Sequence, residues 1–314
     1  MSLRCKSIYV DICRPDFRSI FDSLAPLSLS IKGLSNTLAG YYTRSPPFPG
    51  SSIGQLDQTG QMGHSGTLSG YVKHEDDFYA LTTRLALPYG CGTLVESPSP
   101  TDHKNIWDDS KNWDRELGRV TYHSTEEELH AFDWCLTKVE GLKQGRTYNG
   151  HIPYNYYHPS SDFQHGAVPG FPPADITLAK KYFAPRPAFK PVRTTLLANG
   201  ELCLKTPSRT MREWTIGSVN SIRTYTQSRP HVAPFTLYCI FCSTTGTAFS
   251  REGDSGAIVL DKNFQPVAMV QSGEKAWNGN PDIKHAMDMA SVLTNVEEVN
   301  NWKKGSAVFC SGGD

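Results

Sequence analysis

Short strand-like segments fall into two groups along this chain, and a long polar, proline-rich connection at about 141–191 separates them. Each segment is about four to eight residues long, rich in β-branched and aromatic side chains, and bounded by Gly, Pro, Asp or Ser. Examples are G-T-L-S-G-Y-V and F-Y-A-L-T-T in the first group, and P-F-T-L-Y-C-I-F-C and S-G-A-I-V-L in the second. Such a pattern is typical of antiparallel strands joined by tight turns, and it predicts an all-β fold of two barrels or a sandwich.

The remaining stretches suggest how the domain is bounded. At 314 residues the chain can form one large or two medium domains with an ample core. The run S-P-P-F-P-G-S-S at 45–52 reads as an extended lead-in. We therefore expect an N-terminal extension over 1–50, with a short amphipathic helix near 17–24, and a folded domain over 51–310. Within that domain we expect a first barrel at about 60–145, and a second barrel with a closing helix (287–299) at about 175–300.

Charge and hydropathy exclude several function classes. Lys plus Arg total 31 and Asp plus Glu total 31, so no net field draws the chain to nucleic acid or to an anionic membrane. No stretch approaches the roughly 18 apolar residues that span a bilayer, and the charged N-terminus lacks the apolar core of a secretory signal. We expect a cytoplasmic protein that binds neither nucleic acid nor membrane.

The eight cysteines lie at no repeated spacing, unlike those of a small disulfide-bonded secreted domain. Cys239 and Cys242 form a CxxC pair, but a zinc site needs a second pair of ligands and no second CxxC exists. Phosphate-binding, dinucleotide-binding and HExxH patterns are absent from the sequence as well. We expect mostly buried, reduced thiols, with no cofactor and no metal.

The residues Gly253-Asp254-Ser255-Gly256 form the setting of a nucleophilic serine. A serine hydroxyl becomes a good nucleophile only when a neighbouring base takes its proton. The tetrapeptide is followed by the apolar run A-I-V-L, and upstream lie Phe132-Asp133-Trp134-Cys135-Leu136 and F-Y-A-L-T-T-R-L-A-L at 78–87. The 78–87 segment comes first, the Asp133 segment second and the Ser255 segment last, which is the order histidine, aspartate, serine of one enzyme family.

The chain resembles the trypsin-like (chymotrypsin-fold) serine peptidases over roughly residues 45–300, and is most similar to their intracellular, disulfide-poor, fungal-type branch. The resemblance implies two antiparallel six-stranded β-barrels, a nucleophile at Ser255, and an Asp133 that orients the catalytic imidazole. It also implies an oxyanion hole formed by the N–H groups of Gly253 and Ser255. The secreted branch carries cysteines where this chain has Ala86 and Arg251, which agrees with an unexported protein.

The histidine position departs from the family pattern. Aligning L-T-T-R-L with the family's Leu-Thr-x-x-His places Leu85 where the imidazole belongs, and leucine has no proton acceptor. Loss of that histidine costs serine peptidases about 10⁶ in turnover. His74 and His130 are candidates to replace the missing base. His130 lies three residues before Asp133, so in a strand its side chain would lie on the opposite face from Asp133. We expect Asp133 to be buried and to accept hydrogen bonds from backbone N–H groups or Arg84.

By offset in the family pattern, the substrate pocket would have Phe249 at its base and Gln271, Ser272 and Gly273 along its wall. None of these is acidic, so a preference for Arg or Lys has no basis. A small or apolar substrate side chain, or a filled pocket, is expected.

Three functional hypotheses follow. The first is a pseudoprotease: a peptidase homologue without normal proteolytic activity, kept as a module that binds a peptide or protein or regulates one. The second is an active serine endopeptidase that hydrolyses peptides through an acyl-enzyme at Ser255, using a substitute base or one supplied by the substrate. The third is an all-β scaffold with no peptidase ancestry, in which Ser255 and Asp133 would lie far apart.

Overall fold

The computed structural model describes the parts of the chain that form the two β units and the C-terminal helix. The described residues are 47, 49–56, 62–102, 115–125, 132–140, 191–210, 214–220, 224–226, 235–242, 248–273 and 283–310. The expected helix near 17–24, the proline-rich connection at 141–190, most of the N-terminal extension, and His130 lie outside these residues.

The first unit is an eight-stranded antiparallel sheet with the order β15-β3-β4-β7-β6-β5-β1-β2. Its strands are β1 (Ser52–Leu56), β2 (Met62–Thr67), β3 (Gly70–His74), β4 (Asp77–Thr82), β5 (Leu94–Glu96), β6 (Glu116–His123), β7 (Cys135–Lys138) and β15 (Val308–Phe309). A short 3-10 helix, η2 (Arg84–Ala86), follows β4 directly.

The second unit is a seven-stranded antiparallel sheet in which β9 also pairs with β11. That extra pairing closes β11, β14, β13, β12, β8 and β9 into a barrel and leaves β10 at its edge. The strands are β8 (Leu202–Lys205), β9 (Thr215–Val219), β10 (Thr224–Thr226), β11 (Phe235–Cys242), β12 (Ile258–Leu260), β13 (Pro266–Gly273) and β14 (Ile283–Asp288).

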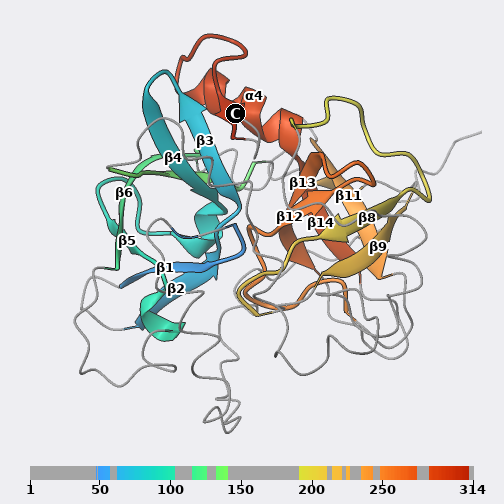
Figure 1. The fold of residues 1–314 in the computed structure, drawn as a ribbon, viewed down its shortest axis with the longest axis horizontal. Helices are drawn as coiled ribbons and strands as arrows, with labels where there is room; N and C mark the ends of the chain where they lie inside the picture. The colour runs from blue at the N-terminus through green and yellow to red at the C-terminus, as the bar shows by residue number, and fades with distance from the viewer. Residues whose placement is uncertain are drawn as a thin grey trace, which may run out of the picture.

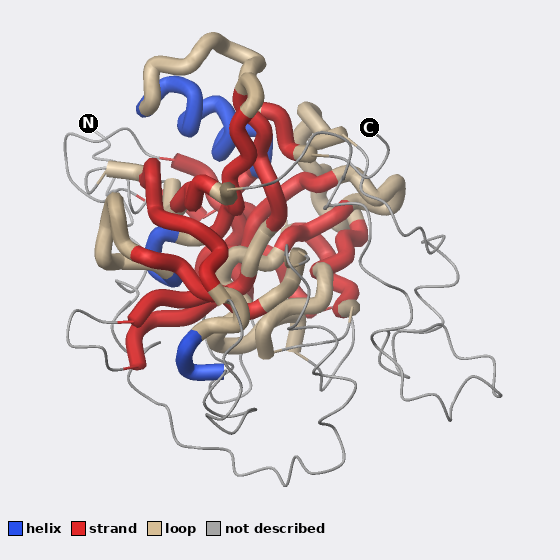
Figure 2. The backbone as a smooth tube through the Cα atoms, turned by 60° about the vertical axis from the view of Figure 1, so that its left-hand side comes forward, coloured by secondary structure: helices blue, strands red, loops and turns tan. Residues whose placement is uncertain are grey.

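These two units confirm the predicted all-β, chymotrypsin-like fold class. Strands dominate the backbone and helices lie at its periphery (Figure 2). The second unit closes into the expected six-stranded barrel, whereas the described strand pairs of the first unit form an eight-stranded sheet whose ends do not pair. Strand β15 forms one edge of this sheet through its pairing with β3, and β2 forms the other edge through its pairing with β1.

One hydrophobic cluster joins the two units. It combines first-unit side chains such as Leu81 and Trp134 with second-unit side chains such as Ile258 and Met287. Helix α4 (Met289–Val299) lies across the top of both units in Figure 1 and adds Val292 to the same cluster. The two units therefore share one hydrophobic core.

Helix α4 begins and docks through identifiable contacts. Asp288 caps it, since its carboxylate accepts a hydrogen bond of 2.8 Å from the N–H of Ser291. In the middle of the helix, the fully buried Trp134 donates from Nε1 to Oδ1 of Asn295 at 2.7 Å. The prediction of a closing helix at 287–299 is thus correct, with a start two residues later because β14 extends to Asp288.

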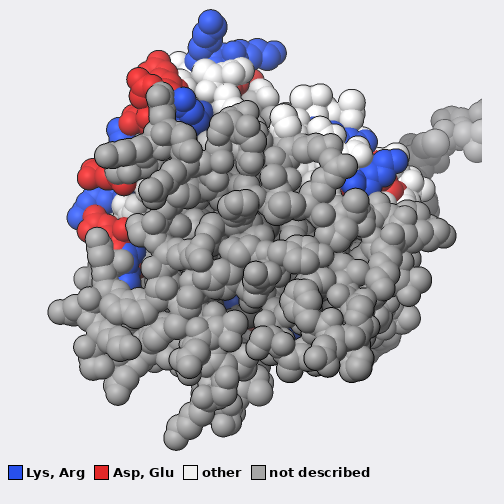
Figure 3. All heavy atoms as spheres, in the orientation of Figure 1, with Lys and Arg blue, Asp and Glu red and all other residues white. Residues whose placement is uncertain are grey.

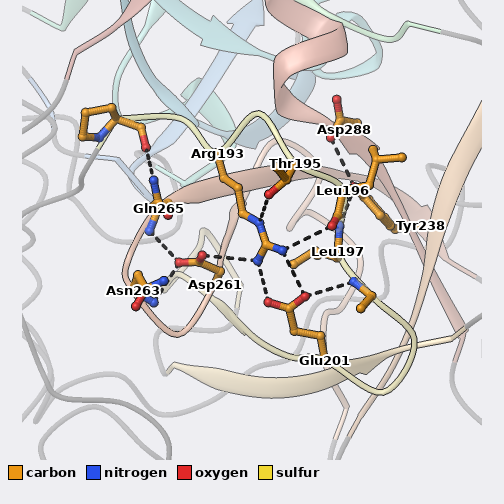
Figure 4. Close-up of polar contacts among 12 residues, drawn as sticks. Arg193, Thr195, Leu196, Leu197, Glu201, Tyr238, Asp261, Asn263, Gln265 and Asp288 are labelled. Atoms are coloured by element: carbon orange, nitrogen blue, oxygen red, sulfur yellow. Dashed lines mark hydrogen bonds and ion pairs between the residues drawn. The ribbon is translucent and has the colours of Figure 1, made fainter.

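A polar network ties the segment entering the second barrel to the barrel itself. The guanidinium of Arg193 contacts Glu201 at 2.5 Å and Asp261 at 3.4 Å, and Asp261 in turn accepts from the backbone of the β12–β13 turn (Figure 4). Tyr238 joins this region by accepting a hydrogen bond of 3.2 Å from the N–H of Leu197. These bonds attach the segment that precedes β8 to the turn that follows β12.

No helix among the described residues is both long and apolar enough to cross a membrane. On the face shown in Figure 3, described acidic and basic side chains lie side by side along the edge of the molecule.

Candidate functional site

Ser255 lies in a tight turn that leads into β12 and is held by the first unit. Gly253 and Gly256 on either side have φ angles of +88° and +96°, which side-chain-bearing residues rarely adopt. A Cβ on Gly256 would also collide with the carbonyl oxygen of Thr67. The Ser255 carbonyl accepts a hydrogen bond of 2.9 Å from the N–H of Thr67, at the end of β2. Residues almost 190 apart in sequence therefore fix the serine turn together.

The hydroxyl of Ser255 faces a backbone carbonyl. It donates a hydrogen bond of 2.9 Å to the carbonyl oxygen of Gln271, in β13. In the described part of the chain, neither this hydroxyl nor the Asp133 carboxylate is hydrogen-bonded to a histidine ring. The hydroxyl proton thus rests on an amide oxygen, which is far too weak a base to remove it.

Asp133 and Leu85 are neighbours. The backbone N–H of Leu85, in η2, donates to Oδ1 of Asp133 at 3.0 Å, and the N–H of Arg84 also contributes a hydrogen bond. The carboxyl is fully buried, and no described residue bonds its second oxygen, Oδ2. Burial raises the pKa of Asp133 to about 7, although these hydrogen bonds and the Arg84 charge act in the opposite direction. The expectation that backbone donors or Arg84 reach Asp133 agrees with this geometry.

His74 and His123 contact residues other than Ser255 and Asp133. His74, considered as a substitute base, stacks on Trp302 with ring centroids 3.8 Å apart. It pairs with Asp77 at one end of β4, whereas Leu85 follows the other end, about 17 Å away by strand rise. His123 bonds the Ser124 carbonyl through Nδ1 at 2.9 Å.

The N–H groups of Gly253 and Ser255 donate no hydrogen bond to any described residue. The turn that displays them is anchored through the buried Asp254 between them. Arg251 donates its N–H to the Asp254 carboxylate at 2.9 Å, and the Asp254 N–H returns a bond to the Arg251 carbonyl at 3.0 Å. Two free N–H groups on a rigid turn can stabilise a negatively charged oxygen.

A buried lysine supports Asp254 from β8. Lys205 Nζ lies 3.5 Å from Oδ2 of Asp254, with both side chains fully buried. Ser208 Oγ donates to Oδ1 at 2.5 Å, and the hydroxyl and N–H of Thr210 bond the same oxygen. Burial alone would raise the pKa of Asp254, but the lysine charge and these donors hold that pKa below its usual range. Sequence reasoning missed Lys205, because a lysine inside L-C-L-K-T reads as a strand-end residue facing solvent.

The residues expected to form the pocket are partly brought together. Phe249 is fully buried and packs against Gly217 and Ile240 inside the second barrel. Gln271 touches Ser255 through its carbonyl, and Ser272 and Gly273 continue β13 beyond it. Sequence reasoning did not anticipate Lys284, whose side chain lies directly against the α-carbon of Gly273.

The His, Cys, Asp and Glu side chains of the described residues are those that a metal site or a disulfide would use. These residues contain no cluster of three or more His, Cys, Asp or Glu side chains suited to a metal ion. None of the six cysteines in the same part of the chain forms a disulfide. Ala86 packs against Gly66, where an added Cβ would lie 2.5 Å from the Ala86 Cβ.

Comparison with known proteins gives similarity at the level of structure only. No protein-family model matches the chain. No curated protein sequence matches it either. Solved structures similar to it include Thermobifida fusca protease A (12% identity, TM-score 0.44), covering 79% of this chain and 95% of that one. The Cellulomonas bogoriensis chymotrypsin is 11% identical with a TM-score of 0.41, and the Nocardiopsis protease is 12% identical with a TM-score of 0.43. Each of these two matches covers 81% of this chain and 95% of the other chain. At these identities the similarity concerns the fold alone.

Proposed function

We propose that this chain is a trypsin-like serine peptidase homologue that binds an extended peptide or protein segment at Ser255 without normal proteolysis. The observation that carries the proposal is the pair of contacts around the missing base. Asp133 bonds the backbone of Leu85, while the Ser255 hydroxyl donates to the Gln271 carbonyl. On this proposal, the aliphatic Leu85 side chain takes the place of the imidazole that would remove the serine proton.

Peptide binding is supported by the wall strand. Ser272 and Gly273 pair with β14 on one side, whereas β12 pairs with β13 only as far as Met269. Among the described residues, no strand covers the other edge of Ser272 and Gly273. An extended peptide can add to such an edge through backbone hydrogen bonds. Its carbonyl carbon would then lie near Ser255, with the N–H groups of Gly253 and Ser255 as oxyanion donors.

The proposal includes a reducing, cytoplasmic setting of the intracellular, fungal-type branch. Its support is that the described cysteines form no disulfide, and that Ala86 and Arg251 stand where the secreted branch has cysteines.

A second candidate is an active endopeptidase whose base comes from elsewhere. The unbonded, fully buried Oδ2 of Asp133 favours it, since a buried carboxylate oxygen without a donor is costly and could orient an incoming imidazole.

Labelling by a fluorophosphonate probe separates the two candidates. The pseudoprotease proposal expects negligible labelling of Ser255 in the unmodified chain and clear labelling of the Leu85→His variant, with Leu85→His/Ser255→Ala as the control. Rapid labelling of the unmodified chain would refute it and support the second candidate. Failure of Leu85→His to gain labelling or peptidase activity would show that Leu85 does not occupy the base position.

A further inference from the structure

Lys284 is a basic side chain placed beside the proposed peptide site. It is only 7% exposed, although it belongs to β14, whose strand neighbours Ile283 and His285 are half-buried. It pairs with Gly273 in β13 on one side and with Ile240 in β11 on the other. Paired residues project to the same face of a sheet, so Lys284 shares the face of Ile240.

That face is the one to which Phe249 belongs. A Cβ on Gly217 would touch both Ile240 and Phe249, which places these two side chains together. Lys284 therefore lies between Gly273, on the expected pocket wall, and Ile240, which adjoins the expected base residue Phe249. A substrate side chain that enters the pocket beside Ser255 would therefore approach Lys284.

The lysine depends on the absence of a side chain at Gly273. A Cβ at this glycine would lie 2.9 Å from Nζ of Lys284 and would also collide with its Cδ. The stem thus packs on Gly273 and places the ammonium on the same sheet face, two residues along β13 from Gln271, the acceptor of the Ser255 hydroxyl. A substrate side chain passing between Ser255 and Gly273 would meet that ammonium.

We propose that Lys284 determines specificity for an acidic residue, Glu or Asp, at the peptide position whose carbonyl lies at Ser255. The inference rests on the proposed function and adds its substrate class. A carboxylate forms a charge-assisted hydrogen bond with an ammonium, and a mostly buried setting strengthens that bond relative to water. The proposal differs from the sequence-based expectation of a small or apolar substrate side chain, which considered only Phe249 and the wall strand.

Peptide binding to the unmodified chain tests the inference. Fluorescein-labelled peptides identical except for a C-terminal Glu, Gln, Leu or Lys would be titrated with the protein and followed by fluorescence anisotropy. We expect the Glu peptide to bind about tenfold more tightly than its isosteric Gln counterpart, and the Lys peptide to bind most weakly. The Lys284→Met variant, which keeps the stem and removes the charge, should abolish the Glu preference.

Lys262→Met is the matched control, because Lys262 is exposed in the turn between β12 and β13. It should leave the Glu-to-Gln ratio unchanged. Equal binding of the Glu and Gln peptides, or a ratio insensitive to Lys284→Met, would overturn the role of Lys284 and leave peptide binding intact. Failure of every peptide to bind would overturn the proposed function itself, and with it the inference.

A second readout uses cleavage. In the Leu85→His variant, fluorogenic peptides that differ only at the residue before the scissile bond should be cleaved with higher kcat/KM for Glu than for Gln. Lys284→Glu in this background should invert the preference toward Lys or Arg. Preferential cleavage after an apolar residue, unchanged by Lys284→Met, would refute the proposal.

Discussion

Lys205 and Asp254 form an ion pair in the interior of the second barrel, with 3.5 Å between Nζ and Oδ2 and no exposed side-chain surface on either partner. The ammonium also donates to Ser208 Oγ at 2.9 Å and to the Thr206 carbonyl at 3.1 Å. Because Asp254 precedes Ser255 in the same turn, this ion pair attaches the turn to β8.

Replacing Lys205 with Met should lower the free energy of unfolding by about 3–5 kcal/mol, because the Asp254 carboxylate would remain buried without its counter-charge. Denaturant titration measures the change. Lys138→Met is the control: the Lys138–Asp77 pair is exposed at 2.7 Å, and its loss should cost about 1 kcal/mol or less. A similar cost for both variants would contradict the structural role given to Lys205.

The pKa of about 7 for Asp133 predicts a particular pH dependence of stability. The folded chain keeps the Asp133 proton up to about pH 7, whereas the unfolded chain releases it near pH 4, so this group destabilises the fold as pH rises between those values. The effect amounts to as much as about 4 kcal/mol. Asp133→Asn removes it, so the stability of this variant relative to the unmodified chain should increase from pH 4.5 to 8. Parallel stability curves for the two proteins would contradict the raised pKa.

Gly256→Ala should destabilise the protein by about 3 kcal/mol or more, because the new methyl group meets the Thr67 carbonyl in addition to the strain of a positive φ. Gly200→Ala is matched to it, since Gly200 has a φ of +74° but open space around its α-carbon. It should cost only about 1 kcal/mol. Thermal unfolding of both variants provides the comparison, and equal losses would mean that the Thr67–Gly256 contact is not tight.

Asn295→Ala should cost about 2–3 kcal/mol, because the indole N–H of the buried Trp134 loses its acceptor and a void remains beneath α4. Thr294→Ala, at an exposed position in the same helix, should change stability by about 0.5 kcal/mol or less. Tryptophan fluorescence during denaturant titration reports both. An Asn295→Ala variant as stable as Thr294→Ala would exclude the bond as an anchor of the helix.

Local pattern predicted most of the strands and the closing helix, since short alternating segments between turn residues specify them directly. The edges of the first sheet could not be predicted, because the pairing of β15 with β3 depends on contacts between residues more than 230 positions apart. At the site, the Gly-Asp-Ser-Gly turn and the Asp133–Leu85 relationship followed from motif order. Lys205 and Lys284 did not, because a lysine in a strand is ordinarily assigned to solvent, and only the packing around Asp254 and Gly273 buries these two.

Strand β15 has a consequence for how the protein is made. Phe309 is buried in the cluster shared by both units, and the N–H of Cys310 donates to the Tyr71 carbonyl at 2.9 Å. During synthesis, β3 therefore leaves the ribosome more than 230 residues before the strand that covers its outer edge. Until β15 pairs with it, that edge of β3 exposes unpaired backbone N–H and C=O groups, which are a template for pairing with another chain.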